Sequence, residues 1–396
     1  MAFLCVITHN QEPAMFSLSH LSAGFIAVLV GYTSSAAIIF QAAAAAGASQ
    51  AETGSWMWAL GIGMGLTCIG FSLRYREPVL TAWSTPGAAL LVTALAGVPM
   101  SEAIGVFLFS SALILLCGLT GWFDKIMRLV PAGLAAAMLG GVLLKFGLDL
   151  FASAQTQPLL VAAMLATYLA LRRRLPRYVI PLSLLAGLLV AGGDGLLRFD
   201  GFEWQLARPV LMTPEFSLTS LLGVGIPLFM VTMASQNVPG IAVLRAHGYH
   251  TPASPLVGWT GFTGLLLAPF GGFAFNLAAI SAAVCMGKEV DPDPKQRYKA
   301  AVWAGVFYLL MGLFGATVVG LFAALPGELV MAIAGLALLG TIGTSLTVAL
   351  ANEQERDAAL LTFMITASGL ALFGIGSAFW GLVIGGGVHW LNRRRQ

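Results

Sequence analysis

Long runs without a charged residue are the feature that most restricts how this chain can fold. Twelve such runs lie between successive charged residues, at 13–51, 53–73, 78–101, 103–123, 129–144, 150–171, 178–193, 216–244, 246–287, 300–327, 329–352 and 358–392. A helix needs roughly 20 apolar residues to cross the hydrocarbon core of a bilayer. The pattern therefore predicts a polytopic, all-α membrane protein.

The composition excludes the two other broad classes of chain. Charged residues make up 9% of the chain and hydrophobic residues 58%. A soluble domain has about 25% charged residues, and a disordered chain is poor in apolar residues. Neither a soluble domain nor a disordered chain fits these values.

The number of predicted transmembrane segments follows from two breaks in the charge-free runs. The run at 246–287 is interrupted at Pro269–Gly272, and the run at 358–392 is interrupted at Gly374–Gly376. Each of these runs is therefore counted as two segments, which gives fourteen in total.

The basic residues give the orientation of the fourteen segments. If both termini lie on one side of the membrane, that side carries Arg74, Arg76, Lys125, Arg128, Arg172, Arg173, Arg174, Arg177, Arg245, Lys288, Lys295, Arg297, Lys299, Arg356 and Arg393 to Arg395. The other side carries only Lys145, Arg198 and Arg208. Cytoplasmic loops have the excess of Lys and Arg, so both termini are predicted to be cytoplasmic, in a bacterial inner membrane. The C-terminal arginines are interpreted as an anchor for the last helix, and no nucleic-acid binding is expected.

The chain divides into two halves of seven segments. We predict a cytoplasmic N-terminus at 1–16, a first repeat at 17–193, an external connector at 194–216, a second repeat at 217–391 and a basic tail at 392–396. Because seven is odd, the second half enters the membrane with the opposite orientation. Inverted repeats of this kind are typical of secondary transporters, whose binding sites lie at discontinuous helices in matching positions.

The third segment of the first half has the sequence of such a discontinuous helix. Val79–Trp83 is rich in β-branched and aromatic residues and predicts a short strand. Ser84 or Thr85, followed by Pro86, is a typical helix start, with a hydroxyl N-cap and proline in the first turn. The segment is therefore expected to be half strand and half helix.

The third segment of the second half repeats this pattern. Pro269 begins a stretch rich in glycine and aromatic residues, and Asn276 is the candidate N-cap of an apolar half-helix. Non-helical backbone at membrane depth is tolerated only inside protein or beside a water-filled cavity. We expect the two breaks to meet in short antiparallel strands near the bilayer midplane. The alternative is a pair of proline kinks in ordinary helices.

Polar residues mark the first segments of both halves. Gln236 and Asn237 precede a predicted helix break at Pro239, and Gly31–Ser35 carries four hydroxyl groups. Amides inside a membrane segment need a partner or a substrate. The Gly340–Ser345 patch in segment twelve fits close helix packing as well as it fits contact with substrate.

Residues 233–249 and 270–283 resemble the benzoate/proton symporter family (BenE-type). That family is grouped with uracil/xanthine permease-like transporters built on seven-plus-seven inverted repeats, and the resemblance covers essentially the whole chain. It implies a core domain of segments 1–4 and 8–11 and a gate domain of segments 5–7 and 12–14. It also places the substrate between the half-helices and segment eight.

The candidate substrate-binding residues follow from this placement. They are Phe40, Ser84, Thr85, Pro86, Gly87, Ser235, Gln236, Asn237, Phe273, Phe275, Asn276, Leu277 and Ala278. Nucleobase permeases typically place glutamates on segments eight and ten, and this chain has no acidic residue there. Helix N-termini carry partial positive charge, so backbone amides near Gly87 and Leu277 are predicted to bind a carboxylate. Phe40, Trp83, Phe273 and Phe275 are predicted to form a slot for an aromatic ring.

Benzoate or a near relative is therefore the predicted substrate. Proton symport is implied by the resemblance alone. The sequence identifies no proton-carrying residue, because Glu328, His20 and the Lys145/Asp149 pair all fit interfacial positions equally well. No metal or cofactor is expected. Besides substrate, proton and lipid, a homodimer is one possible assembly.

Three other functions remain as alternatives. A nucleobase or neutral-solute permease would require acidic residues on segments eight and ten. An inorganic anion exchanger would require a small polar site, against which the phenylalanines argue. An intramembrane enzyme or redox subunit would require paired histidine, cysteine or acidic residues, and the five histidines and four cysteines have no such spacing.

Overall fold

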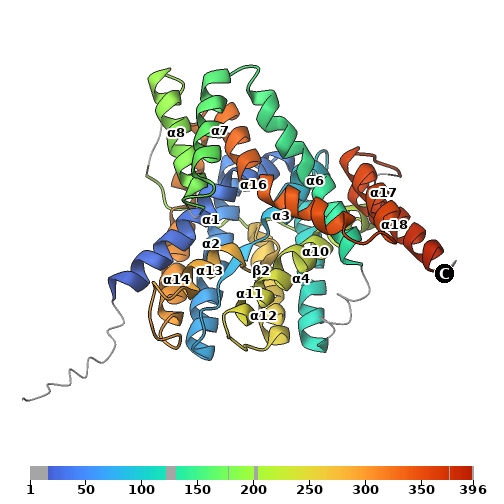
Figure 1. Cartoon of the computed structure of the whole chain (residues 1–396), viewed down its shortest axis with the longest axis horizontal. Helices are drawn as coiled ribbons and strands as arrows, with labels where there is room; N and C mark the ends of the chain where they lie inside the picture. Colours follow the sequence, from blue (N-terminus) through green and yellow to red (C-terminus); the bar gives the residue numbers. More distant parts are fainter. Residues whose placement is uncertain (1–16, 122–130, 177, 200–203, 374, 395–396) are drawn as a thin grey trace, which may run out of the picture.

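Figure 1 shows the computed structural model, which is built almost entirely of helices. It describes residues 17–121, 131–176, 178–199, 204–373 and 375–394, so the predicted segment 1–16 lies outside the described residues. The first-half elements are α1 (Leu18–Ala45), α2 (Gln50–Tyr75), β1 (Thr81–Trp83), α3 (Thr85–Ala94), α4 (Met100–Thr120), α6 (Ala132–Ser153), α7 (Pro158–Leu171) and α8 (Val179–Gly193).

The second half begins with one long helical segment that contains two π-helical turns. Its elements are α9 (Leu218–Ser220), η1 (Leu221–Gly225), α10 (Ile226–Thr232), η2 (Met233–Asn237) and α11 (Val238–Ala246). The remaining elements are α12 (Ala253–Leu267), η3 (Ala268–Phe270), β2 (Phe275–Leu277), α13 (Ile280–Met286), α14 (Tyr298–Leu313), α15 (Gly315–Ala323), α16 (Gly327–Leu350), α17 (Arg356–Ala367) and α18 (Ser377–Arg394).

The apolar sequence runs form helices of membrane-spanning length. Six helical segments of the described chain are long and apolar enough to cross a bilayer, and α14 with α15, bent by 68° between them, makes one further broken span. The breaks expected at Pro269–Gly272 and at Gly374–Gly376 both separate elements, since α12 ends at Leu267 and α18 begins at Ser377. The mostly helical membrane architecture is thus as predicted, whereas the count of fourteen segments stays a prediction.

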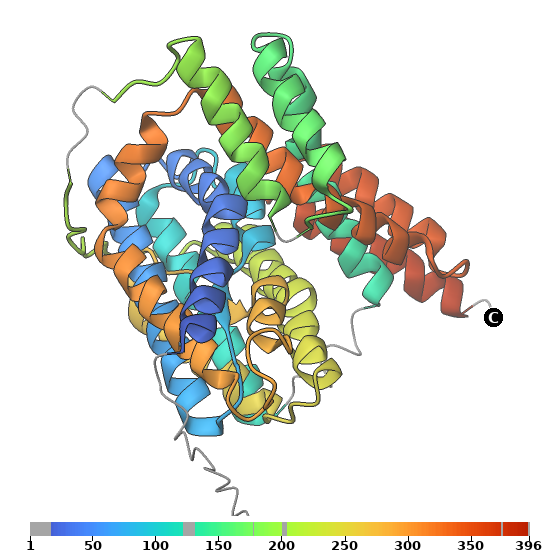
Figure 2. The ribbon, with the colours of Figure 1, turned by 60° about the vertical axis from the view of Figure 1, so that its left-hand side comes forward.

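The helices pack in two groups, which Figures 1 and 2 show from two directions. In one group α14 packs against α1 and α2, and α12 packs against α4. In the other, α6 packs against α16 and α17, α7 against α8, and α17 against α18. The second group contains the helices of the predicted gate domain.

Glycines allow the closest helix crossings in the first group. A Cβ atom on Gly118 of α4 would lie 2.2 Å from the Cα atom of Gly258 on α12, where the neighbour is backbone and cannot move aside. Gly61 of α2 and Gly312 of α14 approach in the same way, with a Cβ on Gly61 2.4 Å from the Cα of Gly312. Small residues at such contacts let membrane helices pack backbone to backbone.

We predict that Gly118→Ala destabilises the protein by about 1–3 kcal/mol, the usual cost of overpacking. Gly70→Ala is the matched control, because a Cβ there meets no atom within 4 Å. Thermal unfolding of the detergent-solubilised variants measures the difference. Equal melting temperatures for the two variants would contradict the close α4–α12 contact.

The two short strands lie side by side although nearly two hundred residues separate them. Strands β1 and β2 are antiparallel, with Ala82 opposite Asn276. Two flanking bonds lengthen the ladder: the Ser84 amide donates to the Ala274 carbonyl (3.1 Å), and the Ala278 amide donates to the Leu80 carbonyl (2.9 Å). The extended backbone thereby satisfies its polar groups inside the protein, as an apolar environment requires.

Ser84, one of the two N-cap candidates of the sequence, is the N-cap of α3, because its side-chain oxygen accepts a hydrogen bond from the Gly87 amide. The prediction of an N-cap at Asn276 is wrong. Asn276 lies in the middle of β2, and α13 begins only at Ile280, after Ala279. Pairing with β1 keeps the chain extended through Leu277, so the helix starts later than its sequence suggests.

The helix break predicted at Pro239 is also wrong. Residues Leu218–Ala246 form one continuous helical segment, and Pro239 lies in the first turn of α11. The π-helical turn η2 directly precedes this turn, with the Val238 amide donating to the Met233 carbonyl. A proline without an N–H is tolerated where a new α-helical stretch begins, and the wider turn creates such a position.

Candidate functional site

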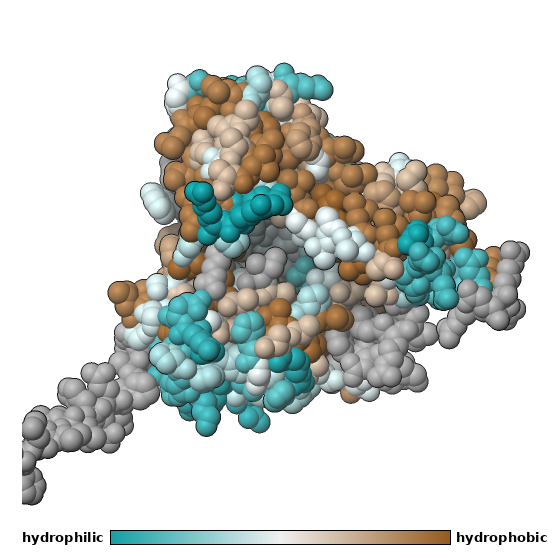
Figure 3. Space-filling view, in the orientation of Figure 1, coloured by the Kyte–Doolittle hydropathy of each residue, from teal (hydrophilic) through white to brown (hydrophobic). Residues whose placement is uncertain are grey.

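A cavity of about 390 Å³ lies between the two groups of helices. One wall comes from α1, the β1–α3 connection, η2, α13 and α14, and the other comes from α8 and α16. The face of the molecule in Figure 3 is hollowed near its centre, between a large apolar region above and a hydrophilic region below. The volume lies within the range of small-molecule sites.

Five of the predicted binding residues line this cavity: Thr85, Pro86, Ser235, Gln236 and Ala278. They come from the start of α3, from η2 and from the connection between β2 and α13. The structure therefore brings together the three segments that the sequence selected, although they are far apart along the chain.

Four other predicted residues do not line the cavity but form hydrogen bonds within the segments that do. The Gly87 amide donates to the Ser84 side-chain oxygen (3.0 Å), and the Leu277 amide donates to the Asn237 side-chain oxygen (3.0 Å). Both amides that were expected to bind a carboxylate thus already have partners within the protein. Asn237, which is fully buried, links η2 to β2.

The four remaining predicted residues lie away from the cavity lining. Asn276 is fully buried, and its side-chain amide donates to the Ala274 carbonyl (2.9 Å). Phe273 and Phe275 are buried as well, and the Phe273 ring packs against Trp56 at 5.7 Å between centroids. Phe40 packs against Phe322 of α15, at 4.8 Å between ring centroids.

Aromatic side chains do reach the cavity, but from other positions. Trp83 of β1 and Tyr308 of α14 both line it. Tyr32 lies beside these rings, at 4.8 Å from Trp83 and 6.2 Å from Tyr308 between centroids. Trp83 belonged to the predicted ring slot, whereas sequence reasoning missed Tyr308, whose only signal was a tyrosine within an otherwise apolar run.

Hydroxyl groups make up most of the remaining polar lining. Ser34 and Ser35 of α1, Ser281 of α13 and Thr341 of α16 were not among the chosen residues. Three of them lie in motifs that the sequence singled out, at Gly31–Ser35 and Gly340–Ser345. Ser281 is hydrogen-bonded to the Tyr308 side chain.

The cavity hydroxyls of α1 and η2 already donate hydrogen bonds to backbone carbonyls of their own helical segments. Ser34 and Ser35 both donate to the Gly31 carbonyl, at 3.0 and 2.8 Å, and Ser235 donates to the Val231 carbonyl at 2.6 Å. Ser35 in turn accepts a hydrogen bond from the Trp83 indole N–H at 2.8 Å. Ser34 and Ser235 are thus left with lone pairs on their side-chain oxygens, which can accept a hydrogen bond from a ligand.

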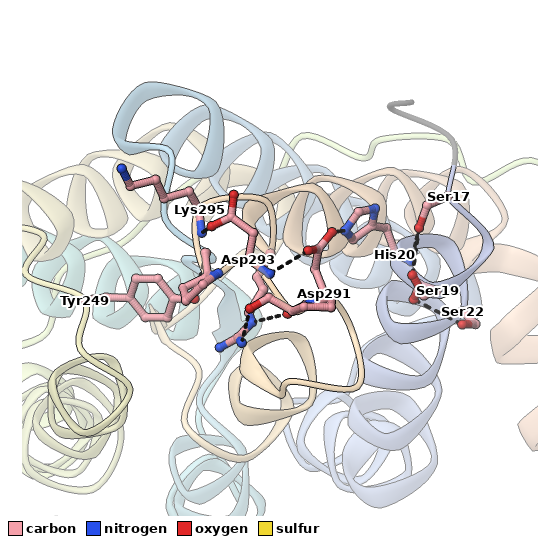
Figure 4. Close-up of polar contacts among 11 residues, drawn as sticks. Ser17, Ser19, His20, Ser22, Tyr249, Asp291, Asp293 and Lys295 are labelled. Atoms are coloured by element: carbon pink, nitrogen blue, oxygen red, sulfur yellow. Dashed lines mark hydrogen bonds and ion pairs between the residues drawn. The ribbon is translucent and has the colours of Figure 1, made fainter. Parts of the chain in front are cut away.

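A second polar cluster lies at the N-terminal end of α1, where this helix contacts the loop after α13 (Figure 4). His20 and Asp291 form a pair with 3.0 Å between Nε2 and Oδ2, and the His20 side chain is buried. The ionisable pair that the sequence suggested, Lys145 and Asp149, is an i,i+4 contact in which the Lys145 side chain is exposed and the Asp149 side chain is partly buried. These pairs are not part of the cavity lining.

Arg297 anchors this same loop from within. Its guanidinium donates to the Asp291 carbonyl (2.8 Å) and to the carbonyl of Met286 (2.9 Å), the last residue of α13. A cation at a helix C-terminus satisfies otherwise unpaired carbonyls and offsets the helix dipole. Arg297 thereby fixes the end of α13 that is remote from the cavity.

We predict that Arg297→Ala lowers the free energy of unfolding by about 1.5–3 kcal/mol, the usual contribution of a hydrogen bond to a charged group. Lys295→Ala, in the same loop, is the control, because the Lys295 side chain is exposed. Thermal unfolding in detergent provides the measurement. If both variants melt at the same temperature, the loop does not depend on Arg297.

Comparisons with known proteins agree on the kind of molecule. The family model described as "Benzoate membrane transport protein" (BenE) matches residues 14–391. The inner membrane protein YdcO of Escherichia coli (strain K12) is 53% identical over 366 residues, which are 92% of this chain and 94% of that protein. A benzoate membrane transport protein of Acinetobacter baylyi is 42% identical over 370 residues, which are 93% of this chain and 94% of that protein.

Solved structures of low sequence identity share the fold. The transmembrane domain of a cyanobacterial bicarbonate transporter, BicA, aligns with a TM-score of 0.59 at 13% identity, over 93% of this chain and 97% of that chain. The murine solute carrier 26 family member A9 anion transporter, in its inward-facing state, aligns with a TM-score of 0.54 at 12% identity, over 95% of this chain and 68% of that chain.

Proposed function

Because this chain belongs to the benzoate membrane transport protein family, we propose that it imports benzoate or a closely related aromatic carboxylate by proton symport. The chain is a membrane transporter, as its family and its structural neighbours indicate. The proposal concerns the substrate, the coupling ion and the path. We also propose that the protein lies in the inner membrane, because the Escherichia coli relative is named an inner membrane protein.

The observation that carries the proposal is the composition of the cavity between the two helix groups. Trp83 and Tyr308 offer ring surfaces, and Gln236 and Thr85 offer polar groups in the same cavity. Mostly apolar cavities with a few convergent polar groups are typical of small-molecule sites. A flat ring with one carboxyl group fits this division between apolar and polar surfaces.

The proposed coupling follows from the membrane potential. An interior-negative potential opposes the entry of an anion by about 2.3 kcal/mol per 100 mV. One proton that enters with each carboxylate removes this cost and adds the pH gradient as a driving force. Symport with one proton is therefore the simplest arrangement that accumulates the substrate.

We also propose the fourteen-segment topology as the frame for alternating access. The core domain would comprise α1–α4 and α9–α15, and the gate domain α6–α8 and α16–α18. Both termini and the Arg172–Arg174 connection would be cytoplasmic. Labelling of single cysteines with a membrane-impermeant reagent tests this, and labelling near Arg174 from outside would refute it.

Purified protein in liposomes provides the test of function. With an inward proton gradient, labelled benzoate should accumulate, and a protonophore should abolish the accumulation. A thermal-shift panel of aromatic carboxylates, nucleobases and inorganic anions runs in parallel. A ligand at one hundred times its Kd stabilises the folded state by about 2.7 kcal/mol, so benzoate should raise the melting temperature clearly.

The panel also separates the proposal from its nearest alternatives. If a nucleobase or bicarbonate stabilises the protein while every aromatic carboxylate fails to do so, the proposed substrate is wrong. The shared fold would then reflect ancestry alone, since a fold does not fix a function.

A further inference from the structure

The chemical groups in the cavity suit a carboxylic acid better than a carboxylate. A carboxylate only accepts hydrogen bonds, whereas a protonated carboxyl group donates one bond and accepts another. The donors and acceptors around the ligand therefore indicate whether it binds as the acid or as the carboxylate.

Gln236 presents one donor and one acceptor together. It lines the cavity on η2, and no hydrogen bond joins its side chain to another residue of the described chain. An amide side chain can pair with a carboxylic acid through two parallel bonds, from the acid O–H to the amide oxygen and from the amide N–H to the acid carbonyl. A carboxylate would instead set one oxygen against the amide oxygen.

Two neighbouring serines of the cavity lining add acceptors. Ser34 and Ser235 each give their proton to a carbonyl of their own helix, so their side-chain oxygens keep lone pairs that can accept a hydrogen bond from a ligand. The backbone amides of Gly87 and Leu277, which would have favoured an anion, already donate to Ser84 and Asn237. These two serines and these two amides therefore have no free proton to offer a negative charge.

Charged groups are placed farther out. Among the cavity-lining residues that the structure describes, the titratable side chain is Tyr308, a phenol that stays neutral at physiological pH. Arg172 of the α7–α8 connection lines a neighbouring recess, which shares Pro176 with the cavity. A site that desolvates a carboxylate without a facing cation favours its neutral form.

We propose that the substrate occupies the cavity as the neutral carboxylic acid, paired with Gln236, so that the substrate itself carries the co-transported proton. This rests on the proposed function. On the outer side, a carboxylate oxygen uses a lone pair to form an O–H bond with a proton from hydronium, whose own O–H bond breaks and leaves water. On the inner side that bond breaks, the proton returns to water, and the anion passes toward Arg172.

Binding measurements on the purified protein at several pH values test the proposal. Because each bound ligand takes up one proton, the apparent Kd for benzoate should rise about tenfold per pH unit between about pH 6 and about pH 8. Benzamide, which has a similar shape but carries no acidic proton, should bind with a Kd that does not change with pH. Benzenesulfonate, which stays ionised, should not compete.

Infrared difference spectra of bound benzoate, labelled with carbon-13 at the carboxyl group, give a direct readout. The protonated acid shows a single carbonyl stretch, whereas the carboxylate shows its symmetric and antisymmetric pair. Detection of the carbonyl stretch supports the proposal. The carboxylate pair, or competition by benzenesulfonate as strong as by benzoate, would overturn it.

Variants separate this proposal from the proposed function itself. Gln236→Leu should weaken benzoate binding about tenfold or more, while Val238→Leu on the exposed side of α11 should leave the affinity unchanged. If benzoate binds with the carboxylate spectrum, the transport function stands and the proton is carried elsewhere. If neither benzoate nor benzamide binds at any pH, the proposed function itself fails.

Discussion

Replacing Ala337 by tryptophan is expected to abolish benzoate uptake while the protein stays folded. Ala337 lies on α16 and lines the cavity from the gate side. An indole there would project into a space of about 390 Å³, so it would displace ligand without compressing packed side chains. Because substrate must occupy this space to cross, uptake into liposomes should fall to the level of protein-free vesicles.

The control adds the same bulk to the same helix outside the cavity. Val348 of α16 is 41% exposed, so Val348→Trp should transport at nearly the normal rate. The melting temperature in detergent should be close to the parent value for both variants. Normal uptake by a folded Ala337→Trp protein would show that the substrate takes another path.

Asn237→Ala should have the second largest effect, a loss of benzoate affinity that results from a shift of β2. The Asn237 side chain accepts the Leu277 amide proton and donates to the Met233 sulfur (3.2 Å). Its removal leaves a buried backbone N–H without a partner, at a cost of about 1–3 kcal/mol. Strand β2 directly precedes the cavity residue Ala278, so the affinity for benzoate should fall about ten- to hundredfold.

Two further variants show whether the loss of affinity is specific to the Asn237 side chain. Gln50→Ala removes an exposed amide at the start of α2 and should leave affinity unchanged. Asn237→Asp keeps an acceptor for the Leu277 amide but buries an acidic group, so it should bind benzoate more weakly than the parent protein as well. Parent-like affinity in Asn237→Ala would contradict a role for this residue in positioning β2.

Local chemistry made part of the fold predictable from the sequence. The start of α3 follows from Ser84 and Pro86, since capping and the proline preference act within one turn. The end of α12 follows from Pro269 and Gly271, whose φ of +89° favours glycine. The start of α13 could not be placed, because the partner that keeps Asn276 extended, Ala82, is remote in the sequence.

The same distinction applies to the site. The segments around Thr85, Gln236 and Ala278 were found because discontinuous helices and intramembrane amides are visible in the sequence. The directions of the aromatic rings were not visible. Phe275 is buried where glycines make room for its ring, since a Cβ on Gly63 would lie 2.4 Å from it, whereas Tyr308 of α14 reaches the cavity from another helix.

The most direct test of the account is a structure of the protein with 4-iodobenzoate, because the iodine marks one position unambiguously. We expect its ring between Trp83 and Tyr308, with the carboxyl group within hydrogen-bonding distance of the Gln236 side chain. An iodine signal confined to another place, such as the recess beside Lys145 between α6 and α17, with this cavity empty, would contradict the proposed substrate site.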